Sequence, residues 1–251
     1  MVTDNFQTQK TLSVDALTEF YHDHFVEDQV SDFLKLVGPV TTATAIVADV
    51  GGGCGFFARA LQLRSGWRVR VMDMDVNSIE TCKKNGVAAK LADALKPEID
   101  GDEVVASFNL ILHHLVGSTT AQTRDMQVLA LRSWATQAER LFVNEYIFVN
   151  EYIYESYVAP RISAYLIWAI TSSQVLSYLG GMVSRVVPSL RANTFGVGVR
   201  FRAADEWVNL FRQAGYEVVA SHRGSDERVS LARRMLLIRS CRRDSFVLAK
   251  S

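Results

Sequence analysis

The chain has 251 residues, 49% of them hydrophobic, with 27 Lys and Arg balanced by 27 Asp and Glu. This composition excludes an intrinsically disordered chain, and the zero formal charge gives no overall electrostatic reason to bind nucleic acid or an anionic membrane. Cys54, Cys82 and Cys241 include no C-x-x-C pair, which argues against a disulfide framework or a metal site and favours a cytoplasmic protein. The first ten residues are polar, so we expect no signal peptide.

Short apolar runs alternate with helical patterns along the chain, which is typical of a mainly parallel sheet covered by helices on both faces. We therefore expect one α/β domain over residues 1–251, with a helical cap at 1–40. Helices are expected at 15–36, 55–62, 78–85, 121–138 and 205–214. Strands are expected at 45–50, 68–73, 87–92, 103–108, 140–148, 217–222 and 244–249.

Residues 149–200 are additional to this alternation, and we expect them to form a helical insertion after the fifth strand. No charged residue lies between Arg161 and Arg185, a stretch long enough in principle to cross a bilayer. Polar residues at 171–174 and the glycine pair at 180–181 divide it, so we expect two apolar helices and no membrane span. The insertion is rich in aromatic residues, as expected of a lid over an apolar acceptor or of a homodimer interface.

A tandem repeat overlaps the fifth expected strand, because the hexapeptide FVNEYI occurs twice in succession over 142–153. Strand side chains alternate with a period of two, so a shift by one whole copy keeps every side chain on the same face of the sheet. The repeat alone therefore leaves open which copy ends the strand. Residues 140–141 lead directly into the first copy, which favours Glu145 and Tyr146 over Glu151 at the strand end.

Glycines at 51–55 lie where a strand must turn tightly into a helix and let a ligand approach the backbone. Two kinds of cofactor could bind such a loop: a dinucleotide or a sulfonium amino acid. Residues 53–58 satisfy the dinucleotide pattern G-x-G-x-x-G/A, and Asp73 follows at about the twenty-residue distance of a ribose-binding acid. Asp49 discriminates between them, because a buried carboxylate would repel a pyrophosphate but not a sulfonium amino acid.

With Asp49 included, the run D-x-G-x-G-x-G resembles motif I of the class I S-adenosylmethionine-dependent methyltransferases. Further segments resemble that family in the same order along the chain: VMDMD at 71–75, LADA at 91–94, FNLILHHL at 108–115 and AGYEVV at 214–219. The resemblance implies a Rossmann-like sheet of seven mostly parallel strands with an antiparallel last strand. It also implies S-adenosylmethionine (SAM) as the cofactor and S-adenosylhomocysteine (SAH) as the product.

The resemblance assigns the ribose hydroxyls to Asp73, the adenine amino group to Asp93 and a cofactor-facing place to Asn109. Asp75 is a weaker alternative to Asp73. The other residues that it places at the cofactor are Asp49, Gly51, Gly53, Gly55, Met74, Ala94 and, on the N-terminal helix, Tyr21.

Methyl transfer from a sulfonium is an in-line displacement in which the protein chiefly positions the nucleophile, so a catalytic base is optional. His113 and His114 follow the fourth strand, and only one of two adjacent helical side chains can face a pocket. Glu145 and Tyr146 are the other candidates, because ligands bind at the carboxyl ends of parallel strands. For all four residues a structural packing role is the alternative.

Arginines raise two further possibilities. Arg191, Arg200 and Arg202 flank the segment 193–198 and could clamp a carboxylate or phosphate of the acceptor, with solvated loop charges as the alternative. Seven arginines between 223 and 243 make the C-terminal segment basic, which would favour an RNA acceptor, but no aromatic stacking pattern accompanies them.

We therefore predict a SAM-dependent methyltransferase that acts on an N, O or S nucleophile of an apolar or aromatic small molecule, within secondary metabolism. No nucleic-acid partner is expected. An NAD(P)-dependent Rossmann oxidoreductase and a non-catalytic SAM-binding or scaffold protein are the alternatives.

Overall fold

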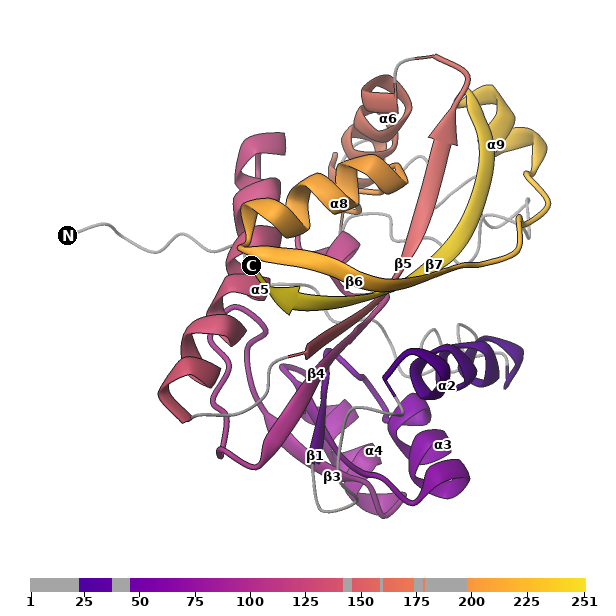
Figure 1. The fold of residues 1–251 in the computed structure, drawn as a ribbon. Coiled ribbons are helices and arrows are strands. Elements are labelled where there is room, and N and C mark those ends of the chain that lie inside the picture. Colours follow the sequence, from indigo (N-terminus) through magenta and orange to yellow (C-terminus); the bar gives the residue numbers. More distant parts are fainter. Residues whose placement is uncertain (1–22, 38–45, 142–145, 159, 174–177, 179–197) are drawn as a thin grey trace.

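The computed structural model describes residues 23–37, 46–141, 146–158, 160–173, 178 and 198–251. In this part of the chain, seven strands form one sheet in the order β3-β2-β1-β4-β5-β7-β6 (Figure 1). The strands are β1 (Ile46–Val50), β2 (Arg68–Asp73), β3 (Ala88–Leu91), β4 (Glu103–Asn109), β5 (Tyr146–Ser156), β6 (Tyr216–Arg223) and β7 (Ile238–Lys250). Pairs among β1 to β5 are parallel, and β7 runs antiparallel to both of its neighbours. The predicted Rossmann-like fold class is confirmed.

Helices cover both faces of the sheet. One face packs against α2 (Asp23–Val37), α3 (Phe56–Ser65) and α4 (Val76–Lys84), and the opposite face packs against α5 (Thr120–Leu141) and α8 (Ala204–Gln213). Three further helices are described: η1 (Leu112–His114) follows β4, α6 (Pro160–Ser172) follows β5, and α9 (Leu231–Met235) precedes β7.

The central strand β1 contributes to the cores on both faces. Ala48 and Val50 join the cluster under α5 and α8, whereas Val47 joins the cluster under α2 and α3. Every residue of β1 is buried, as expected of a parallel strand covered on both faces. Asp49 is the one charged residue in this strand, so its burial requires an explanation from function.

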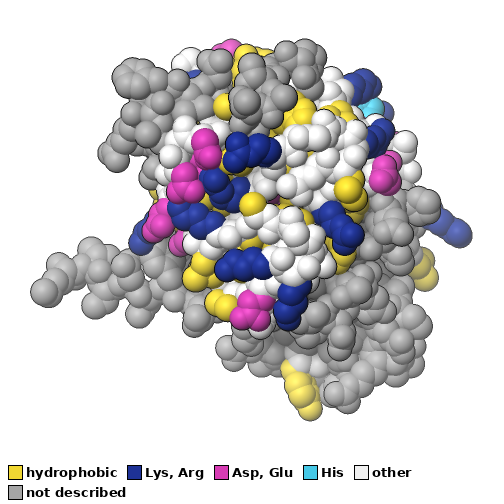
Figure 2. Space-filling view, turned by 90° about the horizontal axis from the view of Figure 1, so that it is seen from below, with side chains coloured by type: hydrophobic (Ala, Val, Ile, Leu, Met, Phe, Trp, Pro, Cys, Tyr) yellow, Lys and Arg dark blue, Asp and Glu magenta, His cyan; other side chains and the backbone are white. Residues whose placement is uncertain are grey.

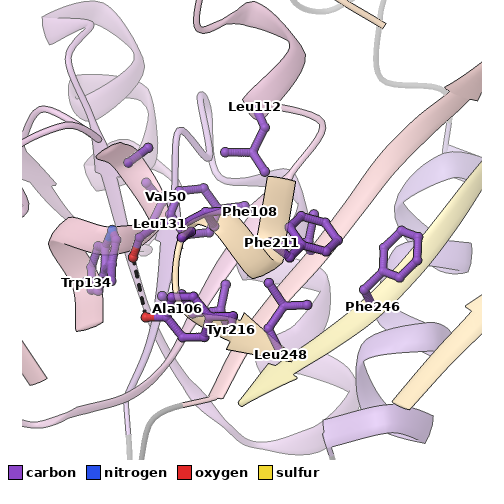
Figure 3. Packing of buried hydrophobic residues seen from close by; sticks show 14 of the residues in the cluster. Val50, Ala106, Phe108, Leu112, Leu131, Trp134, Phe211, Tyr216, Phe246 and Leu248 are labelled. Atoms are coloured by element: carbon purple, nitrogen blue, oxygen red, sulfur yellow. Dashed lines mark hydrogen bonds between the residues drawn. The ribbon is translucent and has the colours of Figure 1, made fainter. Parts of the chain in front are cut away.

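Aromatic side chains fill the core between the sheet and α5 and α8 (Figure 3). Phe108 meets the ring of Trp134 edge to face, and Phe211 does the same with Phe246. Tyr216 is fully buried, and its hydroxyl donates to the backbone oxygen of Leu131 at 3.4 Å. Full burial of each such side chain contributes about 1.5–3 kcal/mol, so this core anchors the strands that carry the site.

The fifth strand departs from the sequence expectation. It begins at Tyr146 and ends at Ser156, not at 140–148, and α5 continues through Leu141. The long antiparallel β7 explains the shift, because it pairs with β5 along the whole strand. The insertion expected at 149–200 therefore begins only after Ser156.

The structure describes one helix of this insertion, α6. It buries Ile167 against Tyr154 and Val199, whereas Ile162 and Tyr165 are exposed. The second expected helix lies outside the described residues, as do residues 15–22 of the N-terminal cap, so the lid stays a prediction. Among the described helices, none combines the length and apolarity needed to cross a membrane.

Carboxylates accompany the C-terminal arginines. The ion pairs are Arg223 with Asp226, Arg233 with Glu227, Arg242 with Asp244, and Arg243 with Asp28. On the face that Figure 2 shows, Lys and Arg side chains are likewise interspersed with Asp and Glu. These pairs lower the local positive charge on which binding to an RNA backbone would depend.

Candidate active site

Four polar residues meet at the edge where β3, β2, β1 and β4 end. Asp93 follows β3, Asp73 ends β2, Asp49 lies near the end of β1, and Asn109 ends β4. Their strands are neighbours and parallel, so the four residues lie along one edge of the sheet. The fold thus brings these sequence-predicted residues together, whereas Tyr21 lies outside the described residues.

The loop after β1 is a glycine turn tied to β2. Gly51, Gly53 and Gly55 adopt left-handed φ angles of 66°, 53° and 77°, which favour glycine. The amide of Gly51 donates to the carbonyl of Met72 at 2.7 Å, and the amide of Gly53 donates to Oδ2 of Asp73 at 2.9 Å. The turn therefore presents backbone rather than side chains at the strand edge.

The turn also passes close to other residues. A Cβ atom on Gly51 would lie 2.5 Å from Cγ1 of Ile111, and a Cβ atom on Gly52 would collide with the carboxylate of Asp49. Gly52 was not among the predicted site residues, although the GGG run in the sequence is the signal that could have found it. Its missing side chain is what lets the Asp49 carboxylate occupy this position.

Asp49 has no exposed surface, and its carboxylate is only half satisfied by the described residues. Oδ1 accepts a hydrogen bond from Nδ2 of Asn109 at 3.3 Å, whereas Oδ2 has no partner in the described part of the chain. Burial raises the pKa of Asp49 to about 7; the Asn109 hydrogen bond opposes this rise and the charge of Asp73 adds to it. A buried, half-satisfied carboxylate fits a ligand that brings a cationic group.

Asp73 supports two backbone turns at once. Its Oδ1 accepts from the amide of Asp75 at 2.8 Å, and its Oδ2 accepts from Gly53. Burial raises the pKa of Asp73, and these two amide hydrogen bonds oppose the rise. A carboxylate has about four acceptor positions, so two donors leave capacity for the hydroxyls of a ribose. Asp75 instead caps α4, where its side chain accepts from the amides of Asn77 and Ser78.

The third strand ends in a turn that Asp93 closes. Oδ1 of Asp93 accepts from the amide of Leu95 at 2.8 Å, and Ala94 and Leu95 pack partly buried against the core. Met74, which follows β2, is 51% exposed. The turn after β3 and the exposed thioether of Met74 could both lie against a flat, apolar purine ring; the sequence analysis expects Asp93 to meet the adenine amino group.

A carboxylate on β5 holds the segment that follows β4. Glu151 is fully buried, and its Oε1 accepts from the amide of Leu112 at 2.7 Å. Its Oε2 lies 2.7 Å from Nδ1 of His113, whose side chain is almost fully buried. Phe201 stacks on the His113 ring with centroids 5.0 Å apart. These contacts fix the orientation of the His113 imidazole.

His114 differs in character from His113. The two ring centroids are 4.1 Å apart. Burial, and then the neighbouring His113, hold the pKa of His114 well below its ordinary value. His114 is therefore a neutral ring at physiological pH and a poor proton acceptor.

The register of β5 decides where Tyr146, one of the other two candidates, lies in the strand. Tyr146 begins β5 and pairs with Val105, so the prediction that it lies at the carboxyl end of the strand is wrong. Asn109 pairs with Asn150 at that end, which places Glu151 of the second repeat copy beside the site. Glu145 lies outside the described residues. The six-residue repeat is the sequence signal that left Glu151 open as an alternative.

Two arginines predicted as a clamp or as solvated loop charges are buried. Arg200 is 6% exposed and Arg202 is 7% exposed, so the solvated alternative is wrong for both. Gln127 of α5 links Arg202 to the segment after β4, because its Oε1 accepts from Nη2 of Arg202 at 2.6 Å and its Nε2 donates to the carbonyl of Leu112 at 2.8 Å. No pattern in the sequence marks Gln127.

A hollow of about 380 Å³ opens beside Arg200. Its described lining consists of Thr120 at the start of α5, Ile162, Tyr165 and Leu166 of α6, and Arg200. The backbone amide of Arg200 donates to the carbonyl of His113 at 2.9 Å, so the hollow borders the His113 segment. The described residues include no cluster of three or more His, Cys, Asp or Glu that could hold a metal.

By sequence, the chain matches no family model and no curated protein. Solved structures resemble its fold. The MccD protein has a TM-score of 0.57 at 13% identity, with 90% of this chain and 97% of MccD covered. LepI in complex with SAM has a TM-score of 0.54 at 14% identity, with 91% of this chain and 54% of LepI covered. The mitomycin 7-O-methyltransferase MmcR has a TM-score of 0.52 at 14% identity, with 90% and 53% covered. The chain thus spans about half the length of LepI and MmcR.

Proposed function

We propose that this chain, whose fold is that of the class I methyltransferases, binds SAM and transfers its methyl group to a small-molecule acceptor. The half-satisfied carboxylate of Asp49 carries this proposal. It lies beside a glycine turn and in line with Asp73, Asp93 and Asn109. A cationic amino-acid ligand would satisfy Asp49, whereas a dinucleotide pyrophosphate would meet its charge with repulsion.

The residues of this edge divide the ligand among them. Asp49 would receive the cationic end of the cofactor, Asp73 the ribose hydroxyls, and Asp93 with the backbone of Ala94 the adenine. The glycine turn at 51–55 leaves room for close approach to backbone amides. When bound, SAM supplies an activated methyl group, so the chain itself needs to orient the acceptor and receive its proton.

His113 is the base that the geometry favours for a hydroxyl acceptor. With Glu151 ionised, its carboxylate accepts a hydrogen bond from Nδ1–H of His113, which leaves Nε2 as the ring nitrogen able to take a proton from the acceptor. The buried carboxylate also stabilises the imidazolium that forms. Glu151 acts through His113 and is a positioning residue, and the neutral His114 packs beside them.

Two observations support an aromatic or apolar acceptor with an oxygen nucleophile. Ile162, Tyr165 and Leu166 give the hollow beside the His113 segment apolar walls. MmcR, one of the similar structures, is an O-methyltransferase of mitomycin, and such a substrate class fits these walls. The homodimer through the insertion after β5 and the cytoplasmic location stay predictions.

Calorimetric titration with SAH and with NADH tests the cofactor. We expect SAH to bind and NADH not to bind, and the reverse result would overturn the proposal in favour of an oxidoreductase. A second assay follows a labelled methyl group from SAM into hydroxylated aromatic compounds. Binding of SAH without transfer to any acceptor would favour a non-catalytic SAM-binding protein.

A further inference from the structure

The segment that carries His113 is held by the backbone of Leu112. The amide of Leu112 donates to Oε1 of Glu151 at 2.7 Å, and its carbonyl accepts from Nε2 of Gln127 at 2.8 Å. The side chains of Glu151 and Gln127 have no exposed surface, and neither does Leu112. Because water does not reach these groups, the position of the Leu112 peptide depends on the two side chains that bind it.

Arg202 fixes the orientation of the Gln127 amide. Oε1 of Gln127 accepts from both Nε and Nη2 of Arg202, at 3.0 Å and 2.6 Å. A guanidinium can only donate hydrogen bonds and a carbonyl oxygen can only accept them. The amide between them must therefore turn its oxygen to Arg202 and its nitrogen to Leu112. A carboxylate at position 127 would serve Arg202 but could not donate to Leu112.

The backbone of Arg202 is in turn attached to β5. Its carbonyl accepts from the amide of Tyr154 at 3.0 Å, and Ile153 forms a parallel bridge with it. Burial lowers the pKa of Arg202 to about 10, so its guanidinium is still charged at physiological pH. The carbonyl and the amide of Leu112 are thus both held from β5, one through this arginine and the other through Glu151.

We propose that Gln127 is a positioning residue for His113 and that Arg202 holds it in its working orientation. His113 follows Leu112 directly, and its own amide and ring both bind the Glu151 carboxylate. A shift of the Leu112 carbonyl would displace His113 from that carboxylate, and small displacements of a catalytic group cost large factors in rate. This inference rests on the proposed methyltransferase function, in which His113 takes the proton of the acceptor.

Two variants separate the two contacts of Gln127. Gln127→Glu keeps an acceptor for Arg202, whose charge keeps the new carboxyl ionised, but it loses the donor to Leu112. Gln127→Met loses both contacts. Ile147→Val is the stability control, because Ile147 lies buried in the core under α5 and α8 and the change removes one methylene group there.

The measurements on the full chain are kcat and KM with an identified acceptor, the Kd for SAH, the melting temperature, and the ring-nitrogen NMR signals of His113. A His113→Gln variant assigns these signals. They report whether the proton lies on Nδ1, where Glu151 binds it, or on Nε2. The NMR measurement needs neither cofactor nor acceptor.

We expect Gln127→Glu and Gln127→Met each to lower kcat by about tenfold or more, with KM and the Kd for SAH unchanged. Both should increase the share of the His113 tautomer that is protonated on Nε2. Gln127→Met should melt at a lower temperature than Gln127→Glu, because it removes the acceptor that Gln127 provides for Arg202. Ile147→Val should also melt below the wild type, yet keep its kcat and its His113 signals.

Wild-type kcat or unchanged His113 signals in a folded Gln127→Glu variant would overturn the inference. So would losses of kcat that follow the melting temperature across the three variants. If Gln127→Glu does not fold, the kcat and the His113 signals of Gln127→Met, compared with those of Ile147→Val, decide. A wild type that neither binds SAH nor transfers a methyl group would count against the proposed function, and the NMR signals would still show whether Gln127 positions the ring.

Discussion

Oε2 of Glu151 lies 2.7 Å from Nδ1 of His113, and Oε1 of the same carboxylate accepts hydrogen bonds from the backbone amides of Leu112 and His113. One buried side chain of β5 thereby sets both the backbone of η1 and the orientation of the imidazole. If His113 takes the proton from a hydroxyl acceptor, a change at Glu151 must affect turnover more than it affects cofactor binding.

Glu151→Gln is expected to lower kcat by about 10- to 100-fold and to leave the Kd for SAH unchanged, because the amide keeps an acceptor for the backbone but no negative charge for the imidazolium. Steady-state kinetics with an identified acceptor and calorimetry with SAH measure the two quantities. Glu155→Gln on the same strand is the matched control, since Glu155 pairs with Arg242. An unchanged kcat in Glu151→Gln would show that the pair is structural.

SAH affinity is expected to fall as pH drops below about 7. In the free protein the pKa of Asp49 is about 7, so the carboxylate gains a proton below that pH and loses its attraction for the ammonium of SAH. The Kd should rise by up to about tenfold for each pH unit below 7 and stay level above it. Titration of the wild type and of Asp49→Asn checks this, because the variant should bind weakly with a flat profile. A flat wild-type profile would contradict the assignment.

The same pKa predicts a conflict between stability and function at Asp49. Its folded pKa of about 7 lies above the ordinary value of 3.8, so its contribution to stability is complete below the ordinary value and is lost as pH rises through 7. Without ligand, Asp49→Asn should therefore be more stable than the wild type at about pH 8, by up to about 4 kcal/mol. Urea unfolding of both proteins at acid and alkaline pH measures the difference. If the unfolding free energies of the two proteins changed with pH in parallel, titration of Asp49 would not be the source of the pH dependence.

Gly52→Ala is expected to weaken SAH binding by about tenfold or more, because the added Cβ would displace the carboxylate of Asp49. Gly66→Ala is the control for an added methyl group. Gly66 has a left-handed φ of 72° with open space around it, so that variant should lose about 1 kcal/mol of stability and keep its SAH affinity. Comparable SAH affinity in the two variants would argue against a ligand role for the Asp49 position.

Asp73 and Asp75 offer a matched pair only two residues apart. Asp73→Asn should weaken SAH binding by about 100-fold, because hydrogen bonds from two ribose hydroxyls would lose their charged acceptor. Asp75→Asn should bind SAH normally, since asparagine caps a helix as well as aspartate does. Calorimetry on both variants separates the roles. A larger loss of SAH affinity in Asp75→Asn than in Asp73→Asn would indicate that Asp75 binds the ribose.

Much of the cofactor edge could be predicted from local patterns. The glycines after β1 need left-handed backbone, Asp73 ends β2 and Asp93 follows β3, so both features are visible in short windows of sequence. Strand β2 was predicted at 68–73, which are its observed bounds. Neighbouring parallel strands then bring their ends together without further information.

The acceptor side was harder to predict, because it depends on distant pairing. The repeat at 142–153 permits two registers with identical faces, and pairing with β7 selects the one that places Glu151 against His113. Gln127 and Arg202 lie 75 residues apart and meet only when α5 and the segment after α6 pack together. Contacts of this kind leave no local periodicity to read.

The sequence by itself determined the sheet class and the row of acidic residues along one sheet edge, because backbone preferences and hydrophobic periodicity are local properties. The tertiary structure alone decided which FVNEYI copy lies beside the end of β4 and that Arg200 is buried rather than solvated. Strand register and burial are set by the free energy of the whole packed chain, since each depends on partners far away in sequence.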